Sequence, residues 1–252
     1  MALITMLTDF GTADPYVAEL RGVLHSRAPG VTLVDLSHGV PPGDVRAAAY
    51  LLGRAWHRFP VGTVHLVVVD PGVGTGRAAL AFAARGHRFV GPDNGVFTAA
   101  LDLAEESPVA LPTPADAAPT FHGRDLFAPA AAALALGAEC SALGEALPTL
   151  PVRLVLPLPY HEGKTVIGEV ISVDRFGNLV TNLTTGEAPP HATLEVEDTE
   201  VGRLRRTFSD VESGQLLAYV GSGGQVEIAV RDGSAARRLG LGVGGRVRAR
   251  LG

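Results

Sequence analysis

The sequence is poor in residues that mark several common classes of protein. Its 252 residues include one cysteine, Cys140, which excludes an intrachain disulfide framework and a multi-cysteine metal site. Lys164 is the only lysine, so a Gly-Lys-Ser/Thr phosphate-binding loop is absent and Schiff-base chemistry has one poorly placed candidate. No apolar run is long enough to cross a bilayer, and no charged leader precedes the first apolar segment. These features predict a cytoplasmic protein without a membrane partner.

The charge balance argues against a nucleic-acid partner. The net charge is −5 and the basic residues form no cluster. A hydrophobic content of 46% and a charged content of 19% are typical of a globular protein. The length suits one large domain or two ordinary ones, each with its own core.

The first part of the chain alternates short apolar strands with helices. Strands are expected at residues 3–8, 31–36 and 64–69, followed by a strand pair at 79–84 and 88–90. Helices are expected at residues 14–27, 44–58, 96–105 and 126–136. In the first helix, Asp14 is the expected N-cap and Pro15 the first helical residue. This alternation predicts a mostly parallel α/β sandwich domain over residues 1–150.

The second part has a different composition. Residues 151–163 contain several prolines and then a glycine, which indicates an extended linker. Short strands separated by glycine are then expected at residues 165–173, 193–196, 216–220, 226–230 and 246–251. This spacing predicts a smaller all-β domain, a barrel or a sandwich, over residues 164–252.

One glycine-rich segment, residues 70–77, begins where an apolar strand ends. Open α/β sheets bind ligands at this edge, and bare glycines let a ligand approach the backbone. His122 lies beside Gly123, just before a predicted helix, a position suited to facing a ligand. Asp70, Arg77 and His122 are therefore candidates for one site that handles water. A plain hairpin loop and a structural histidine remain the alternatives.

Other polar residues suggest a nucleoside ligand. Asp9 ends the first strand, where a carboxylate can accept both hydroxyls of a ribose, although it can also cap a turn. Phe176 offers a stacking face for a purine, and the amide of Asn178 matches the edge of adenine. Ser222, in a glycine-rich turn, offers a hydroxyl to a carboxylate. Ordinary turns explain these second-domain residues equally well.

The sequence disfavours two common helpers of catalysis. The glycine string lacks the strand-to-helix context and spacing of a dinucleotide fingerprint, so a nicotinamide cofactor is not expected. The Asp and His residues lack the tight spacing of zinc or two-metal sites, so no metal is expected either.

Seven segments, in order, resemble the S-adenosylmethionine hydroxide adenosyltransferase family, the hydrolytic relatives of the fluorinase and chlorinase enzymes. They are residues 8–11, 70–77, 91–95, 120–129, 174–182, 207–210 and 222–230. The resemblance implies an α/β domain joined to a β-barrel domain. It also implies homotrimers that hold S-adenosyl-L-methionine between subunits, as substrate and without a cofactor.

The resemblance implies roles for individual residues. Asp70, Arg77 and His122 match the water-activating triad of the hydrolytic members. Halogenating relatives carry tyrosine and small hydroxyl residues at Asp70, His122 and Gly123, and an extra segment after the glycine string. These differences favour water over halide as the nucleophile.

The same resemblance implies a set of substrate contacts. Asp9 would bind the ribose hydroxyls. The purine would meet Phe176, Phe208 and Asn178, and the methionine end would meet Asp174 and Ser222. The remaining expected contacts are Asn94, Phe121, Gly123 and Val230.

The expected reaction is attack of water-derived hydroxide on ribose C5′, which releases adenosine and L-methionine. Arg77 is expected to keep Asp70 ionised, because a nearby cation favours the charged carboxylate. Three alternatives remain: a halide-using synthase of the same family, a metal-dependent hydrolase and a non-catalytic protein that binds S-adenosylmethionine or adenosine.

Overall fold

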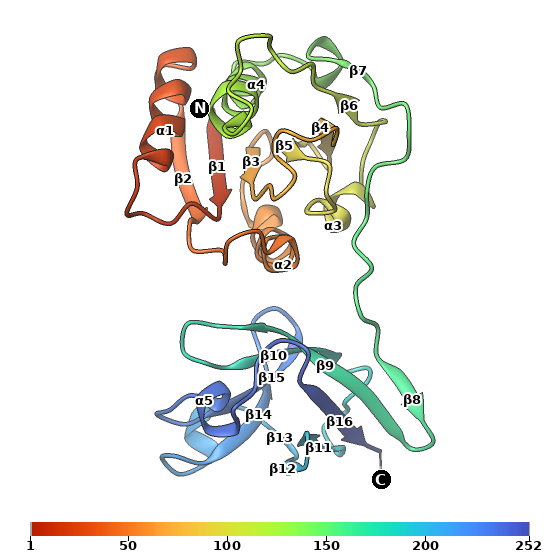
Figure 1. The fold of residues 1–252 in the computed structure, drawn as a ribbon. Helices are drawn as coiled ribbons and strands as arrows, with labels where there is room; N and C mark the ends of the chain where they lie inside the picture. Colours follow the sequence, from red (N-terminus) through yellow and green to blue (C-terminus); the bar gives the residue numbers. More distant parts are fainter. Residues whose placement is uncertain (1, 252) are drawn as a thin grey trace. The chain divides into compact units, whose positions relative to one another are not determined.

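The chain folds into two compact units. A computed structural model describes residues 2–251; one unit ends at Leu154 and the other begins at Val155 (Figure 1). Each unit has a sheet of its own. No helix within residues 2–251 is both long and apolar enough to cross a membrane.

The first unit contains a seven-stranded mixed sheet in the order β2-β1-β3-β5-β4-β6-β7. Its strands are β1 (Leu3–Thr8), β2 (Thr32–Ser37), β3 (Val64–Val68), β4 (Ala79–Ala84), β5 (His87–Pro92), β6 (Val109–Ala110) and β7 (Glu145–Ala146). Strands β2, β1, β3 and β5 run parallel, whereas β4, β6 and β7 pair antiparallel. The expected α/β sheet is therefore present as a mixed sheet, in which half of the neighbouring pairs are parallel and half antiparallel. Arg85 and Gly86 (φ 48° and 73°) join β4 to β5 in a tight hairpin, which leaves no room for a crossover.

Helices cover both faces of this sheet (Figure 1). They are α1 (Tyr16–Arg27), α2 (Val45–Ala55), α3 (Thr98–Leu101) and α4 (Ala128–Ala135). Leu20 and Leu24 of α1 share one buried cluster with α4 and the near face of the sheet. Leu52, Trp56 and Phe97 form a second cluster on the opposite face. Two separate clusters on the two faces are the hallmark of a three-layer α/β arrangement.

The helix ends differ from the expectation in two places. Pro15, not Asp14, is the N-cap of α1, and no side chain caps this helix. The first helical bond runs from the amide of Glu19 to the carbonyl of Pro15 (2.9 Å), so the helix begins one residue late. Helix α3 is much shorter than residues 96–105, because Ala104 already pairs with Ala84 of the sheet.

The second unit is built on a barrel-like, nearly closed sheet in the order β12-β11-β16-β9-β10-β15-β14-β13, with β8 beside β9. Its strands are β8 (Tyr160–Glu162), β9 (Thr165–Val173), β10 (Leu179–Thr184), β11 (Thr193–Val196), β12 (Thr199–Gly202), β13 (Leu204–Arg205), β14 (Leu216–Val220), β15 (Gln225–Val230) and β16 (Arg246–Arg250). Helix α5 (Ala235–Leu239) packs against its core, and a 3-10 turn spans Phe208–Asp210. The five expected strands are present; β8, β10, β12 and β13 were not expected.

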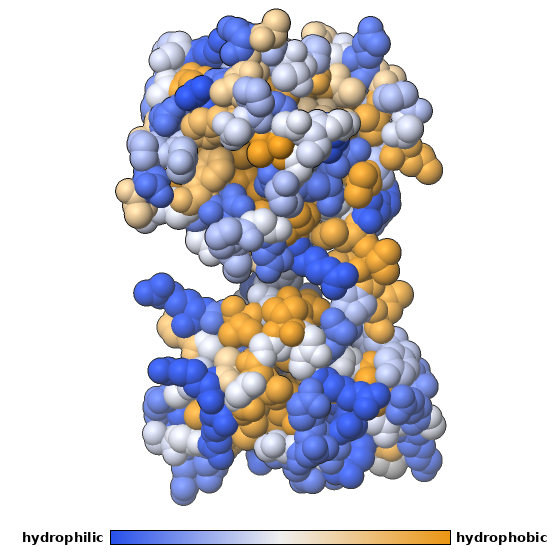
Figure 2. Space-filling view, in the orientation of Figure 1, coloured by the Kyte–Doolittle hydropathy of each residue, from blue (hydrophilic) through white to orange (hydrophobic). Residues whose placement is uncertain are grey.

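The segment between the sheets exposes apolar side chains. Its first part is attached to the first unit, since the amide of Val152 donates to Asp93 (2.8 Å). On either side of Val152, Leu150, Val155 and Leu158 are 91%, 84% and 80% exposed. Apolar residues accordingly line this connecting segment in the space-filling view (Figure 2). Strand β8 falls within residues 151–163, so the expected linker is in part a strand.

Candidate active site

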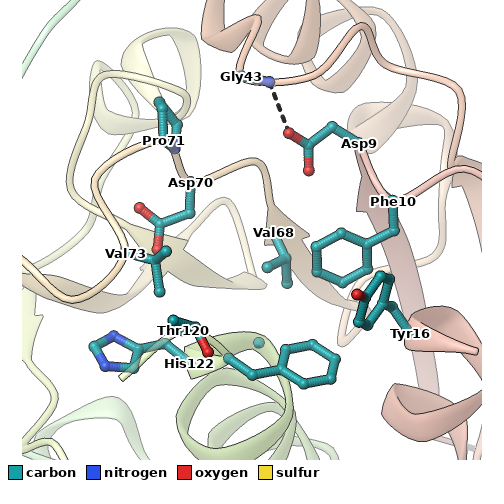
Figure 3. A pocket seen from close by; sticks show the side chains of 12 residues that line it. Asp9, Phe10, Tyr16, Gly43, Val68, Asp70, Pro71, Val73, Thr120 and His122 are labelled. Atoms are coloured by element: carbon teal, nitrogen blue, oxygen red, sulfur yellow. Dashed lines mark hydrogen bonds between the residues drawn. The ribbon is translucent and has the colours of Figure 1, made fainter. Parts of the chain in front are cut away.

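A pocket of about 420 Å³ opens at the carboxyl ends of β1 and β3 in the first unit (Figure 3). Asp9 and Phe10 follow β1, and Asp70 follows β3. Residues 120–123, which precede α4, form the wall opposite them. The parallel pairing of β1 with β3 brings the ends of these strands to one edge of the sheet.

Asp70, Arg77 and His122 meet beside this pocket. Arg77 makes a bidentate pair with Asp70: its Nε donates to Oδ1 at 2.8 Å and its Nη2 donates to Oδ2. The same Nη2 lies 3.0 Å from Nδ1 of His122. The Asp70 and Arg77 side chains are 5% and 10% exposed, so this ion pair is poorly screened by solvent. The guanidinium also lies over the ring of Phe127, 5.2 Å from its centre.

The contact with Arg77 fixes the protonation of His122. A guanidinium only donates hydrogen bonds, so Nδ1 must accept and the ring is assigned as neutral with its proton on Nε2. Burial lowers the pKa of His122, and the charge of Arg77 lowers it further, against the opposite effect of Asp70 and Asp125. Nδ1 is therefore occupied, and Nε2 is the free donor of this ring.

Asp9 lies across the pocket from His122 (Figure 3). One carboxylate oxygen, Oδ2, accepts the amide of Gly43 at 2.8 Å. The other oxygen points away from Gly43, toward the space between the labelled side chains (Figure 3). Asp9 thus combines a backbone anchor with a free acceptor, an arrangement that suits a hydroxylated ligand.

Three aromatic rings form one side of the pocket. Phe10, Tyr16 and Phe121 contact one another edge to face or tilted, with ring centres 5.5 to 5.7 Å apart. A side chain at Gly123 would crowd this wall, since an added Cβ would lie 3.0 Å from Val68. Phe121 and Gly123 were expected at the site, whereas Phe10, Tyr16 and Thr120 were missed. Their nearness in sequence to Asp9 and His122 was the available signal.

Asn94, an expected substrate contact, does not line this pocket. Its Nδ2 donates to the carbonyl of Val69 (2.9 Å), and its Oδ1 accepts the amide of Val96 (3.2 Å). Asn94 therefore holds the backbone immediately before Asp70.

The expected residues of the second unit lie at turns and strand ends. Asp174 organises the turn between β9 and β10: Oδ1 accepts the amides of Phe176 and Asn178 at 2.9 and 2.8 Å. Its Oδ2 accepts Nδ2 of Asn178 at 2.8 Å. Asn178 is buried, whereas the ring of Phe176 is 76% exposed and free to stack. Asp174 thus holds this turn together, and the turn presents Phe176 outward.

Three further expected residues lie on or near strands β14 and β15. Phe208 is part-exposed and packs on Tyr219, with ring centres 4.9 Å apart. Ser222 lies in the turn between the two strands. The side chain of Val230 is buried in the core, so a ligand can reach this residue only through its main chain.

Metal ligands do not gather in the part of the chain that is described. Residues 2–251 hold no group of three or more His, Cys, Asp or Glu side chains placed to share an ion. Both oxygens of Asp70 are bonded to Arg77 instead.

Comparison with known proteins agrees with this architecture. The chain matches the family models for the SAM hydroxide adenosyltransferase N-terminal domain over residues 4–144 and C-terminal domain over residues 168–248. A Thermus thermophilus protein named (R)-S-adenosyl-L-methionine hydrolase is 47% identical, over 98% of this chain and 99% of that relative. A protein of Actinoplanes sp. named fluorinase is 31% identical, over 72% of this chain and 71% of that relative.

A solved structure shares the whole fold. The crystal structure of an uncharacterized conserved protein from Thermotoga maritima superposes with a TM-score of 0.90 at 34% identity, covering 98% of this chain and 99% of that one. With both family models matched in order and relatives of full length, this chain belongs to the SAM hydroxide adenosyltransferase family.

Proposed function

We propose that this protein hydrolyses S-adenosyl-L-methionine to adenosine and L-methionine. Hydroxide derived from water attacks ribose C5′ in line with the C5′–S bond, and methionine leaves as a neutral thioether. The observation that carries the proposal is the contact of Asp70, Arg77 and His122 beside a nucleoside-sized pocket. The 47% identical Thermus relative, named a hydrolase of this substrate, supports it.

The chemistry needs a nucleophile more than an acid, because the sulfonium is already a good leaving group. Holding water in line with the bond to be broken contributes about 7–11 kcal/mol in the most favourable cases. Removing its proton contributes about 10²–10⁴-fold. The chain's own residues must supply both effects.

The three side chains divide this work. Arg77 cannot accept a proton, and Nδ1 of His122 already accepts from Arg77. Asp70 keeps a spare lone pair on each oxygen, so Asp70 takes the water proton in this mechanism. The Nε2 proton of His122 donates to the water oxygen and orients it. Excluding bulk water strengthens the attraction between the incipient hydroxide and the sulfonium.

The substrate contacts follow from the family resemblance. Asp9 holds the ribose hydroxyls through the oxygen not bonded to Gly43. Phe176, Phe208 and Asn178 hold the purine, and Asp174 and Ser222 hold the methionine end. Phe121 and Gly123 line the ribose side, Asn94 acts through the backbone before Asp70, and Val230 contributes its main chain. No cofactor or metal takes part.

The assembly that we propose is a homotrimer whose sites lie at subunit interfaces. The exposed rings and the apolar connecting segment support a protein surface that is covered in the assembly. A cytoplasmic location follows from the single cysteine. Sedimentation of the purified protein should give three times the mass of one chain.

One experiment tests the reaction directly. The purified protein is incubated with S-adenosylmethionine in ¹⁸O-labelled water, and the products are analysed by mass spectrometry. The label should appear in the 5′ hydroxyl of adenosine. Unlabelled adenosine would exclude water as the nucleophile, and unchanged substrate with measurable binding would indicate a non-catalytic binding protein.

The fluorinase relatives make halide transfer the second candidate. Asp70 and His122 place a carboxylate and an imidazole where halogenating members carry hydroxyl side chains. We therefore expect no 5′-halo-adenosine in the presence of fluoride or chloride. Activity that survives EDTA would likewise separate this reaction from a metal-dependent hydrolysis.

A further inference from the structure

A chain of polar groups runs from buried Thr8, the residue before Asp9, through buried His38 to the exposed pair of Asp35 and Arg21. Oγ1 of Thr8 is 2.8 Å from Nδ1 of His38, and Nε2 of His38 is 3.0 Å from Oδ1 of Asp35. Asp35 is also paired with Arg21 of α1. Thr8 is fully buried and His38 is 7% exposed. None of these four side chains lines the pocket.

The proton positions in this chain follow from its donors and acceptors. The amide of Phe10 donates to Oγ1 of Thr8 at 3.3 Å, which leaves the Thr8 hydroxyl proton free to donate to Nδ1 of His38. Nε2 of His38 then carries the ring proton and lies 3.0 Å from Oδ1 of Asp35, an ion-pair contact outside hydrogen-bond geometry. Burial raises the pKa of Asp35, but its contacts with Arg21 and His38 outweigh burial, so this pKa lies below its ordinary value. The bond between Thr8 and His38 is therefore the well-formed buried hydrogen bond of this chain.

Hydrogen bonds that involve Thr8 and His38 fix the position of the loop that carries Asp9. On one side of Asp9, Thr8 is held by His38; on the other, the amide of Gly11 donates to the carbonyl of His38 at 2.8 Å. Gly11 adopts a φ of 66°, which suits glycine and lets its amide turn toward His38. The carboxylate of Asp9 is then bonded to Gly43, in the loop that follows His38. His38 is therefore the junction between the two loops that place this carboxylate.

We infer that His38 is a positioning residue for the ribose-binding carboxylate: through Thr8 and its own carbonyl it sets where Asp9 presents its free oxygen. The bond to Thr8 does the positioning, and the Asp35–Arg21 pair holds the imidazole in the ring orientation that this bond needs. The inference rests on the proposed role of Asp9 toward the ribose hydroxyls. It predicts that substitution of His38 weakens the binding of ligands that carry those hydroxyls.

Replacements of different length can each keep one of the two contacts of the His38 ring and remove the other. Asparagine places its amide near the position of Nδ1, so His38→Asn can keep the bond to Thr8. Glutamine places its amide near the position of Nε2, so His38→Gln keeps Asp35 and leaves the buried Thr8 hydroxyl without its acceptor. His87→Gln is the matched control, because His87 is 4% exposed but sits in β5, away from the pocket.

Binding of nucleosides is the readout, because it does not depend on turnover. Titration calorimetry gives the Kd of adenosine and of 2′,3′-dideoxyadenosine, which lacks both ribose hydroxyls. We expect His38→Gln to raise the Kd of adenosine about tenfold, as for one lost buried hydrogen-bond partner. The Kd of dideoxyadenosine should rise less than about twofold. For both ligands, the Kd of the His38→Asn variant should stay within about threefold of the wild-type value, and that of His87→Gln within about twofold.

The outcomes separate positioning from a general loss of structure. Equal weakening of both nucleosides by His38→Gln, or equal behaviour of the Asn and Gln variants, would overturn the inference. Two variants of Thr8, the other partner of this bond, keep the test valid if a His38 variant misfolds. Thr8→Val should reproduce the loss of affinity for adenosine, and Thr8→Ser, which keeps the hydroxyl, should retain it. If the wild-type protein binds the two nucleosides equally, the ribose role of Asp9 fails and the inference with it. Hydroxyl-dependent binding without adenosine formation would instead overturn only the proposed hydrolysis.

Discussion

At the scale of single residues, the guanidinium of Arg77 joins the two groups that we propose act on water. It bonds both oxygens of Asp70 and the imidazole of His122 at once. A bidentate fork has a set direction, which a lysine ammonium does not have. In the proposed mechanism, the orientation of Asp70 and of His122 therefore depends on a single side chain.

Removing either partner of Arg77 should abolish most of the activity. We expect Asp70→Ala and His122→Ala each to lower the rate of adenosine formation at least about 100-fold, since each removes a group that binds or deprotonates water. Chromatographic assay of adenosine measures the effect. Asp198→Ala and His25→Ala, at exposed positions, are the matched controls and should keep full activity. Normal turnover in both triad variants would refute the assignment.

The acid side of the pH profile reports on His122. Protonation of Nδ1 would set an N–H against the N–H of Arg77, so activity requires the neutral ring. Burial and the charge of Arg77 lower the pKa of His122 below its ordinary value of 6.5, so kcat/KM should begin to fall only below that pH. Asp125→Asn removes a charge that raises this pKa and should move the acid limb to still lower pH. An acid limb at or above pH 6.5 would contradict this account.

At the scale of secondary-structure elements, a buried pair of histidines links β1, β3 and β5. His65 and His87 are 0% and 4% exposed, with 3.1 Å between Nε2 of His65 and Nδ1 of His87. Oγ1 of Thr5 lies 2.7 Å from Nδ1 of His65. Burial, and then the neighbouring His87, lower the pKa of His65 from 6.5 to about 3.

This lowered pKa predicts acid sensitivity of the first unit. The unfolded chain binds a proton at His65 below pH 6.5 while the folded chain does not, so the free energy of unfolding falls as the pH drops from 6.5 toward 3. The slope from this residue is about 1.4 kcal/mol per pH unit. Urea unfolding at pH 7 and pH 5 measures it. His65→Gln should flatten the slope, whereas a slope unchanged by this substitution would show that other groups cause it.

The elements themselves could be predicted where periodicity is strong and were missed where a turn interrupts it. β9, β11 and β14 coincide with their expected ranges, and β9 and β14 are bounded on both sides by glycine or polar residues. β10 begins directly after the Asp174 turn, and a register shift after Val180 breaks its alternation. Only the tertiary pairing with β9 and β15 identifies it as a strand.

At the scale of the whole molecule, the candidate site was predictable to the extent that it lies at strand ends. Asp9 and Asp70 directly follow or lie near apolar strands, and Gly123 follows His122 at the start of a helical segment (Gly123–Phe127). Tyr16 left no such signal, and His38, although it directly follows β2, was not singled out. The first lies at the start of a helix, and the second is recognisable only from contacts with residues 30 positions away.

The proposed trimer predicts that two inactive variants can restore activity to each other. If the α/β unit of one subunit works with the β unit of its neighbour, Asp70→Ala and Phe176→Ala damage opposite halves of each site. Co-expression of the two inactive variants then yields mixed trimers in which some interfaces join two intact halves. Random assembly should restore about a quarter of the wild-type rate of adenosine formation. Each variant co-expressed with itself is the control and should remain inactive. Two affinity tags, one on each variant, prove that the trimers are mixed. If such mixed trimers show no activity, one chain supplies the whole site, because every site then contains one of the two substitutions.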